Sequence, residues 1–142
     1  MQRLLAPALL VRNAEIGPLF VRLIIGWHLV YGTHDNVFEY ARMVEFRDFL
    51  ARTGFPVPMF SAFLSAYAQF ICGFLYILGL FTRPAAAVMI INFIAALVMV
   101  HRSQPYPRAA LALIMLFCSL FLLFHGPGRL ALDNRLVRRD MK

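Results

Sequence analysis

Five of the polar side chains within or at the ends of the long apolar stretches of this sequence define the chemistry expected there. Arg22 is the only charged residue inside these stretches; the other four are the amides Gln69 and Asn92 and the imidazoles His28 and His101. Amides and neutral imidazoles form hydrogen bonds, for example to a quinone carbonyl, and a guanidinium binds anionic groups. We therefore expect a binding site for a polar ligand or a quinone.

Each of these residues also has a purely structural explanation. Arg22 can extend to the lipid headgroups, or face the bundle interior and hold an anionic or polar group. The four stretches contain no carboxylate except Glu15 at the first boundary, so Gln69 and Asn92 are the best partners for Arg22. These amides can equally bond one another and hold helices together. The histidines show no HxH or HxxH spacing, so we expect no metal site. His28 is expected to be buried.

Four apolar stretches position these side chains, at about residues 16–34, 59–80, 84–100 and 109–125. A helix of about 20 residues crosses the hydrocarbon layer of a bilayer. The chain is 61% hydrophobic and 15% charged, with a mean hydropathy of +0.71. A soluble domain of this length cannot cover so much apolar surface. We predict an all-α integral membrane protein, a single domain over residues 1–142 that forms a four-helix bundle.

The segment between the first two spans, residues 35–58, alternates charged and apolar residues. Apolar side chains at Met43, Phe46, Phe49 and Leu50, with Phe38 upstream, fit a helical period of 3.6. The pattern predicts a short amphipathic helix on the membrane surface. A second interfacial helix is expected within residues 1–13.

The basic residues indicate membrane topology rather than nucleic-acid binding. All but one of the 14 are arginines, scattered between the spans instead of clustered on one polar face, so no nucleic-acid partner is expected despite the net charge of +7. Eight lie on the side of the two termini and five on the other, which favours cytoplasmic termini. The eight are Arg3, Arg12, Arg83, Arg129, Arg135, Arg138, Arg139 and Lys142, and the five are Arg42, Arg47, Arg52, Arg102 and Arg108.

Five groups of residues follow one another along the chain. They are Arg22 with Gly26 and Gly32; Phe49-Leu50 with Gly54-Phe55-Pro56-Val57-Pro58; the run 73–86, Gly-Phe-Leu-Tyr-Ile-Leu-Gly-Leu-Phe-Thr-Arg-Pro-Ala-Ala; Val100-His101; and the run 126–133, Gly-Pro-Gly-Arg-Leu-Ala-Leu-Asp. In this order and spacing the chain resembles the DoxX family of small four-helix membrane proteins, over most of its length.

The resemblance implies a membrane redox setting. The DoxX family takes its name from a subunit of an archaeal thiosulfate:quinone oxidoreductase, and some members are similar to partners in bacterial redox or sulfur-stress complexes. A bacterial-type inner membrane, other membrane subunits or a second copy as partners, and quinone as the cofactor are implied. The family usually has a Glu at the position of Gln69. If the family's Arg and Glu form an intramembrane pair, Gln69 removes a proton-accepting group.

Three functions remain open from the sequence. The first is an accessory or quinone-associated subunit of a membrane redox complex, with Arg22, Gln69 and His101 lining a polar spot. The second is a quinone-linked oxidoreductase acting on its own, in which His28 or His101 exchanges the proton. The third is a small transporter, which the lack of intramembrane acids and of paired broken helices disfavours.

Overall fold

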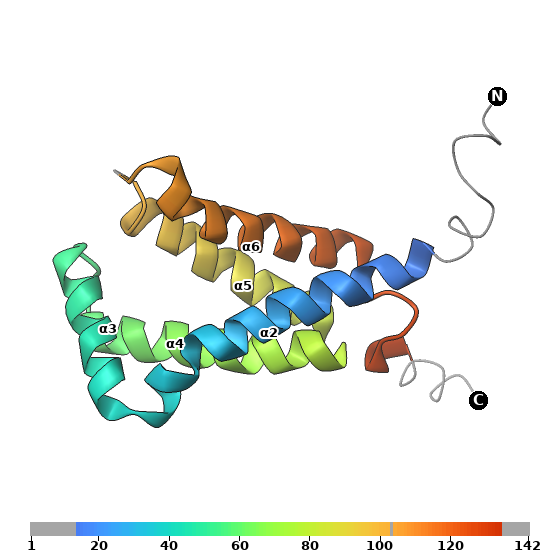
Figure 1. Ribbon diagram of the computed structural model, residues 1–142, viewed down its shortest axis with the longest axis horizontal. Helices are drawn as coiled ribbons and strands as arrows, with labels where there is room; N and C mark the ends of the chain where they lie inside the picture. The colour runs from blue at the N-terminus through green and yellow to red at the C-terminus, as the bar shows by residue number, and fades with distance from the viewer. Residues whose placement is uncertain (1–13, 103, 135–142) are drawn as a thin grey trace.

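The chain folds into four long helices and one shorter helix that lies across one end of them (Figure 1). The computed structural model describes residues 14–102 and 104–134; the interfacial helix expected within residues 1–13 lies outside them. The elements are η2 (Ala14–Ile16), α2 (Gly17–Phe38), α3 (Tyr40–Arg52), α4 (Pro58–Leu78), α5 (Thr82–Met99) and α6 (Tyr106–His125). Helices α2, α4, α5 and α6 are each long and apolar enough to cross a membrane. The predicted all-α fold with four spans is confirmed.

Proline and glycine set the limits of the long helices. Pro18, Pro58 and Pro107 stand in the first turns of α2, α4 and α6, where the missing backbone N–H of proline costs no hydrogen bond. Helix α4 ends at Leu78, two residues earlier than expected, because Gly79 adopts a left-handed conformation with φ of +67°.

The long helices associate as two pairs. Helix α2 packs on α4 through Gly26 and Gly73, where the backbones approach closely, and α5 packs on α6. Figure 1 shows α3 beyond one end of the bundle, and the start of α2 and the red segment that follows α6 at the other. We call these the α3 end and the terminal end. The pairs meet along a core of small and apolar side chains, in which the hydroxyl of Tyr76 donates to Ser119 Oγ at 3.0 Å.

Helix α3 buries its apolar face against the bundle. Met43 and Leu50 are buried with Ala62 and Ala66 of α4, and Phe46 packs at their edge. Sequence periodicity identifies Met43, Phe46 and Leu50 on this face, whereas Phe38, expected upstream on the same helix, is the last residue of α2 and is exposed. On the exposed face, the hydrogen bond and the charge of Glu45, 3.0 Å from the Arg42 guanidinium, raise the pKa of Arg42. Helix α3 thus covers one end of the four-helix bundle and presents charges outward.

The terminal end is closed by residues 126–134, which we call the closing segment. Its Asp133 accepts hydrogen bonds from the backbone N–H groups of Phe81 (2.7 Å) and Thr82 (3.0 Å) at the start of α5. The backbone N–H of Asp133 donates to the Gly79 carbonyl at 2.9 Å. One carboxylate therefore serves as the N-terminal cap of a helix that begins 51 residues earlier in the chain.

Replacing Asp133 by alanine is expected to lower the free energy of unfolding by about 1–2 kcal/mol, because two N–H groups at the start of α5 lose their acceptor. Unfolding in detergent, followed by the fluorescence of Trp27, measures the change. The control is Asp48→Ala, which removes an exposed carboxylate that, among the described residues, pairs with its neighbour Arg47 alone. That variant should change stability little, and equal losses in both variants would contradict the capping role.

Candidate functional site

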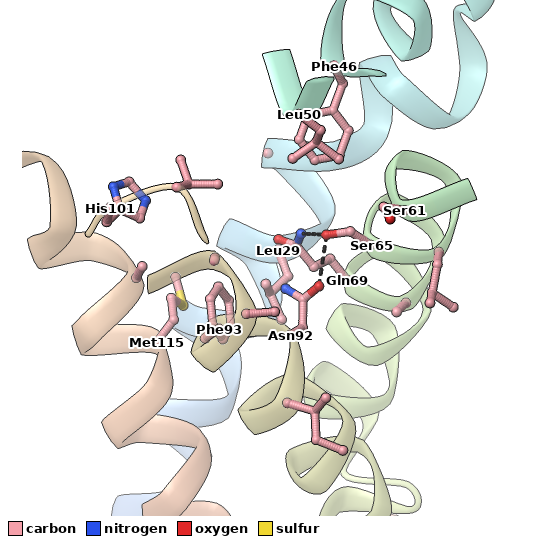
Figure 2. A pocket seen from close by; sticks show the side chains of 18 of the residues that line it. Leu29, Phe46, Leu50, Ser61, Ser65, Gln69, Asn92, Phe93, His101 and Met115 are labelled. Carbon is pink, nitrogen blue, oxygen red and sulfur yellow. Dashed lines mark hydrogen bonds between the residues drawn. The ribbon is translucent and has the colours of Figure 1, made fainter. Parts of the chain in front are cut away.

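A cavity of about 560 Å³ lies between the two helix pairs on the side of the α3 end. All five helices contribute to its walls: α2 with His28 and Leu29, α3 with Phe46 and Leu50, and α4, α5 and α6 with the larger share. Figure 2 shows lining side chains from the different helices around the cavity, among them Leu29, Phe46 and Met115. The volume is typical of sites for small molecules.

The polar centre of the cavity is a chain of three side chains. The Gln69 amide donates to Ser65 Oγ at 3.0 Å, and the Ser65 hydroxyl donates to Asn92 Oδ1 at 2.8 Å (Figure 2). Gln69 and Ser65 are one turn apart on α4, and Asn92 lies on α5 near its middle. The Ser65 contact uses the oxygen of Asn92 and leaves its NH₂ group available to a ligand.

This chain can run in either direction, because both amides can rotate and a hydroxyl both donates and accepts. In one direction Asn92 offers an NH₂ group to the cavity, and in the reverse direction it offers a carbonyl oxygen. Either way, one amide donor and one amide acceptor remain free at the two ends. The cavity can therefore bind a carbonyl or a hydroxyl group.

The basic lining groups come from three different elements. His101 Nδ1 lies 3.0 Å from Gln104 Oε1, beyond the end of α5, and the exposed Arg108 stands at the start of α6. His28 of α2 is exposed rather than buried as expected, because it sits on the cavity side of α2 and not in the core. Among the described lining residues there is no Asp or Glu. The cavity therefore has basic and neutral polar groups in mostly apolar walls.

Arg22 is separate from the cavity. It is 1% exposed and packs at the terminal end, where its Nη2 donates to the Leu130 carbonyl at 3.4 Å. Its Nε and Nη1 have no hydrogen-bond partner among the described residues. The guanidinium lies against Gly79 and the closing segment, so it does not extend to the lipid headgroups. Arg22 is therefore not in contact with Gln69 or Asn92, and the three side chains do not form one binding site.

The structure thus brings four of the five expected site residues to one cavity: His28, Gln69, Asn92 and His101. Sequence reasoning missed Ser65, the central member of the hydrogen-bonded chain, and also Ser61 and Arg108. A signal for Ser65 exists, since it lies four residues before Gln69 and therefore on the same face of the helix. Among the described residues no group of three or more His, Cys, Asp and Glu could hold a metal ion.

Comparison with known proteins now identifies the family. The model of the DoxX family matches residues 17–102, more than half of the chain. The chain belongs to the DoxX family. The matched region runs from α2 through α5, and it includes every cavity-lining residue except those of α6. The closing segment lies beyond it.

One curated relative of this DoxX-family protein is an uncharacterised membrane protein of Mycobacterium tuberculosis. The two are 35% identical over an alignment of 102 residues, and the match covers 62% of this chain and 63% of the relative. The chain therefore aligns with less than two thirds of the relative's length. No solved structure matches this chain significantly.

Proposed function

We propose that this DoxX-family protein is a small accessory subunit of a membrane redox complex, and that its cavity holds the head group of a quinone. The observation that carries the proposal is the Gln69–Ser65–Asn92 chain, a polar group in the middle of two spanning helices beside a cavity with mostly apolar walls. A quinone head is a flat apolar ring with carbonyl acceptors, and it suits such a lining.

The chemistry of the hydrogen-bonded chain favours holding a quinone over converting it. Amide and hydroxyl side chains do not ionise near neutral pH. The three residues therefore bind the head group without supplying the protons of its reduction. Reduction would then occur in a partner subunit that carries the electron donor.

A second candidate is a quinone-linked oxidoreductase that acts on its own. The lining of the cavity by His28 and His101 favours it, because an imidazole exchanges protons near neutral pH. In that case one histidine would have to reach the quinone oxygen, and the electron donor would have to bind this chain directly.

For the topology, we propose that the protein lies in a bacterial-type inner membrane with its terminal end toward the cytoplasm. The excess of Lys and Arg on the side of the termini supports this orientation. The α3 end, with the cavity-lining residues His101 and Arg108, would then face the outer side of the membrane.

Purification from the native membrane in mild detergent tests the proposal. We expect the chain to retain a partner protein and quinone, measured by mass spectrometry and by quinone extraction. Replacing Asn92 by leucine should lower retained quinone and quinone affinity about tenfold, because one buried hydrogen bond to the head group is lost. The partner should be retained, since the substitution lies inside the cavity.

Asn36→Leu is the matched control, because Asn36 lies on α2 outside the cavity lining. It should leave quinone binding unchanged. A normal unfolding curve for Asn92→Leu separates loss of the ligand from loss of the fold. A lone chain that carries quinone and a bound chromophore would instead support the independent enzyme, and a chain that binds no quinone would refute both functions.

A further inference from the structure

Besides Phe49 of α3 (38% exposed) and Leu111 of α6 (49% exposed), three apolar side chains both line the cavity and are exposed on the outer surface of the molecule. They are Leu64 of α4, which is 59% exposed, and Val88 and Ile91 of α5, which are 44% and 71% exposed. A side chain that faces both a cavity and the outside stands at an opening between them. All three lie well inside their spans, at a depth where the surroundings are lipid hydrocarbon.

Small side chains line the cavity behind these three residues. The cavity side of α4 includes Ala68, and the cavity side of α5 includes Ala95 and Ala96. The hydrogen bond from Ser65 to Asn92 joins α4 and α5 at this depth in the bundle. We call the exposed part of the cavity wall between α4 and α5 the α4–α5 slot and define it by Leu64, Val88 and Ile91.

The polar centre of the cavity lies directly behind the slot. Asn92 follows Ile91 on α5 and Ser65 follows Leu64 on α4, so a head group at the amide has the slot beside it. The opposite side of the cavity, between α2 and α6, exposes His28 and Arg108. A hydrocarbon chain avoids such groups because its contact with them displaces their water or their hydrogen bonds.

We infer that the ligand is a long-tailed lipid whose hydrocarbon tail leaves the cavity through the α4–α5 slot into the bilayer. The inference rests on the proposed function, which supplies the quinone head at Asn92, and it assigns Leu64, Val88 and Ile91 as the residues that select for a tail. The ligand then enters sideways from the lipid, and its tail remains in an apolar environment throughout.

The test compares a benzoquinone that carries one hydrocarbon tail with its tail-less parent, by equilibrium binding to the purified full chain in detergent. Ile91→Trp fills the slot. It should lower the affinity for the tailed quinone about tenfold and change that for the tail-less quinone less than about twofold. Retained binding of the tail-less quinone also shows that the variant is folded.

Ile94→Trp is the matched control, because Ile94 is exposed on the same helix but does not line the cavity. It should change neither affinity. A milder variant, Ile91→Ala, removes contacts with the tail without adding bulk, and should weaken only the tailed quinone, by about threefold. This variant decides the test if the tryptophan prevents folding.

The outcomes separate the two proposals. If the unmodified chain binds both quinones and neither Ile91 variant weakens the tailed quinone selectively, the tail does not leave through the α4–α5 slot. The proposed function would then still stand. If Leu111→Trp, which adds bulk to the α6 wall of the cavity, selectively weakened binding of the tailed quinone, the tail would lie along α6 and the slot would be overturned. Failure of the unmodified chain to bind either quinone would refute the proposed function together with the inference.

Discussion

Replacing Gly79 by alanine is expected to destabilise the protein by about 3 kcal/mol, the largest effect of a single methyl group that we predict. Gly79 has φ of +67°, a left-handed conformation that costs an L side chain energy. A Cβ at this position would also overlap the buried guanidinium of Arg22 and lie 2.8 Å from Ala131 Cβ. The added methyl group must therefore displace either the arginine or the closing segment. Equilibrium unfolding in detergent measures the loss.

Gly54→Ala separates the two causes. Gly54 has φ of +81°, but nothing lies within 4 Å of the added Cβ. This control carries only the conformational cost and should lose about 1 kcal/mol. If the two variants lose the same free energy of unfolding, the added methyl group at Gly79 does not meet Arg22, and the terminal end is not packed as described above.

Gly26→Ala is expected to lower the free energy of unfolding by about 2 kcal/mol, because it separates α2 from α4. The new Cβ would lie 2.7 Å from the Gly73 carbonyl oxygen and 2.8 Å from Ile77 Cγ1. Gly73 meets α2 from the other side, with Gly26 O at 2.9 Å from its own added Cβ. Close approach of this kind is how helices associate in a bilayer, where no hydrophobic effect drives them together. The same unfolding measurement applies.

Gly32→Ala provides the comparison within the same helix. Gly32 lies six residues further along α2, and its added Cβ meets nothing within 4 Å. Alanine favours a helix over glycine by up to about 1 kcal/mol, so this variant should be neutral or slightly stabilised. Gly26→Ala is therefore expected to lower the free energy of unfolding, and Gly32→Ala to leave it unchanged or raise it slightly. Similar losses at both positions would argue that Gly26 matters for helix flexibility and not for contact with Gly73.

These glycines bear on the cavity as well as on stability. The Gly26–Gly73 contact holds α2 and α4 together as one pair, and the closing segment ties α4 to α5 at the terminal end. The cavity lies between the pairs on the other side, toward the α3 end. Contacts at the terminal end thus hold the helices together, while the ligand-sized cavity lies beneath α3 at the other end.

Sequence alone determined the four spans and α3, because their signals are local. A run of apolar residues must become a helix in lipid, where each backbone N–H and C=O needs a partner within the segment. The predicted boundaries near 16, 59, 84 and 109 agree with the observed helices to within a few residues. The largest difference is at the end of α2, which continues to Phe38 instead of residue 34, and α4 ends two residues early because Gly79 has a left-handed φ.

The candidate residues were identifiable by type, but their grouping was not. Gln69 and Asn92 stand out as amides in apolar runs, yet their shared contact passes through Ser65, a residue too common to attract notice. Arg22 stands out most of all by charge, and it lies with the closing segment instead of the amides. Side-chain type indicates what a residue can bind, while its neighbours depend on the packing of other helices.

Sequence by itself therefore determined the membrane setting, the all-helical fold and a set of polar candidates. Tertiary structure decided that four of them share a cavity, that Arg22 does not, and that Asp133 caps α5 from far along the chain. The physical reason is the range of the interactions. Hydropathy and backbone hydrogen bonding act within about 20 residues, whereas helix pairing and rotation depend on close contacts between segments that the local pattern does not encode.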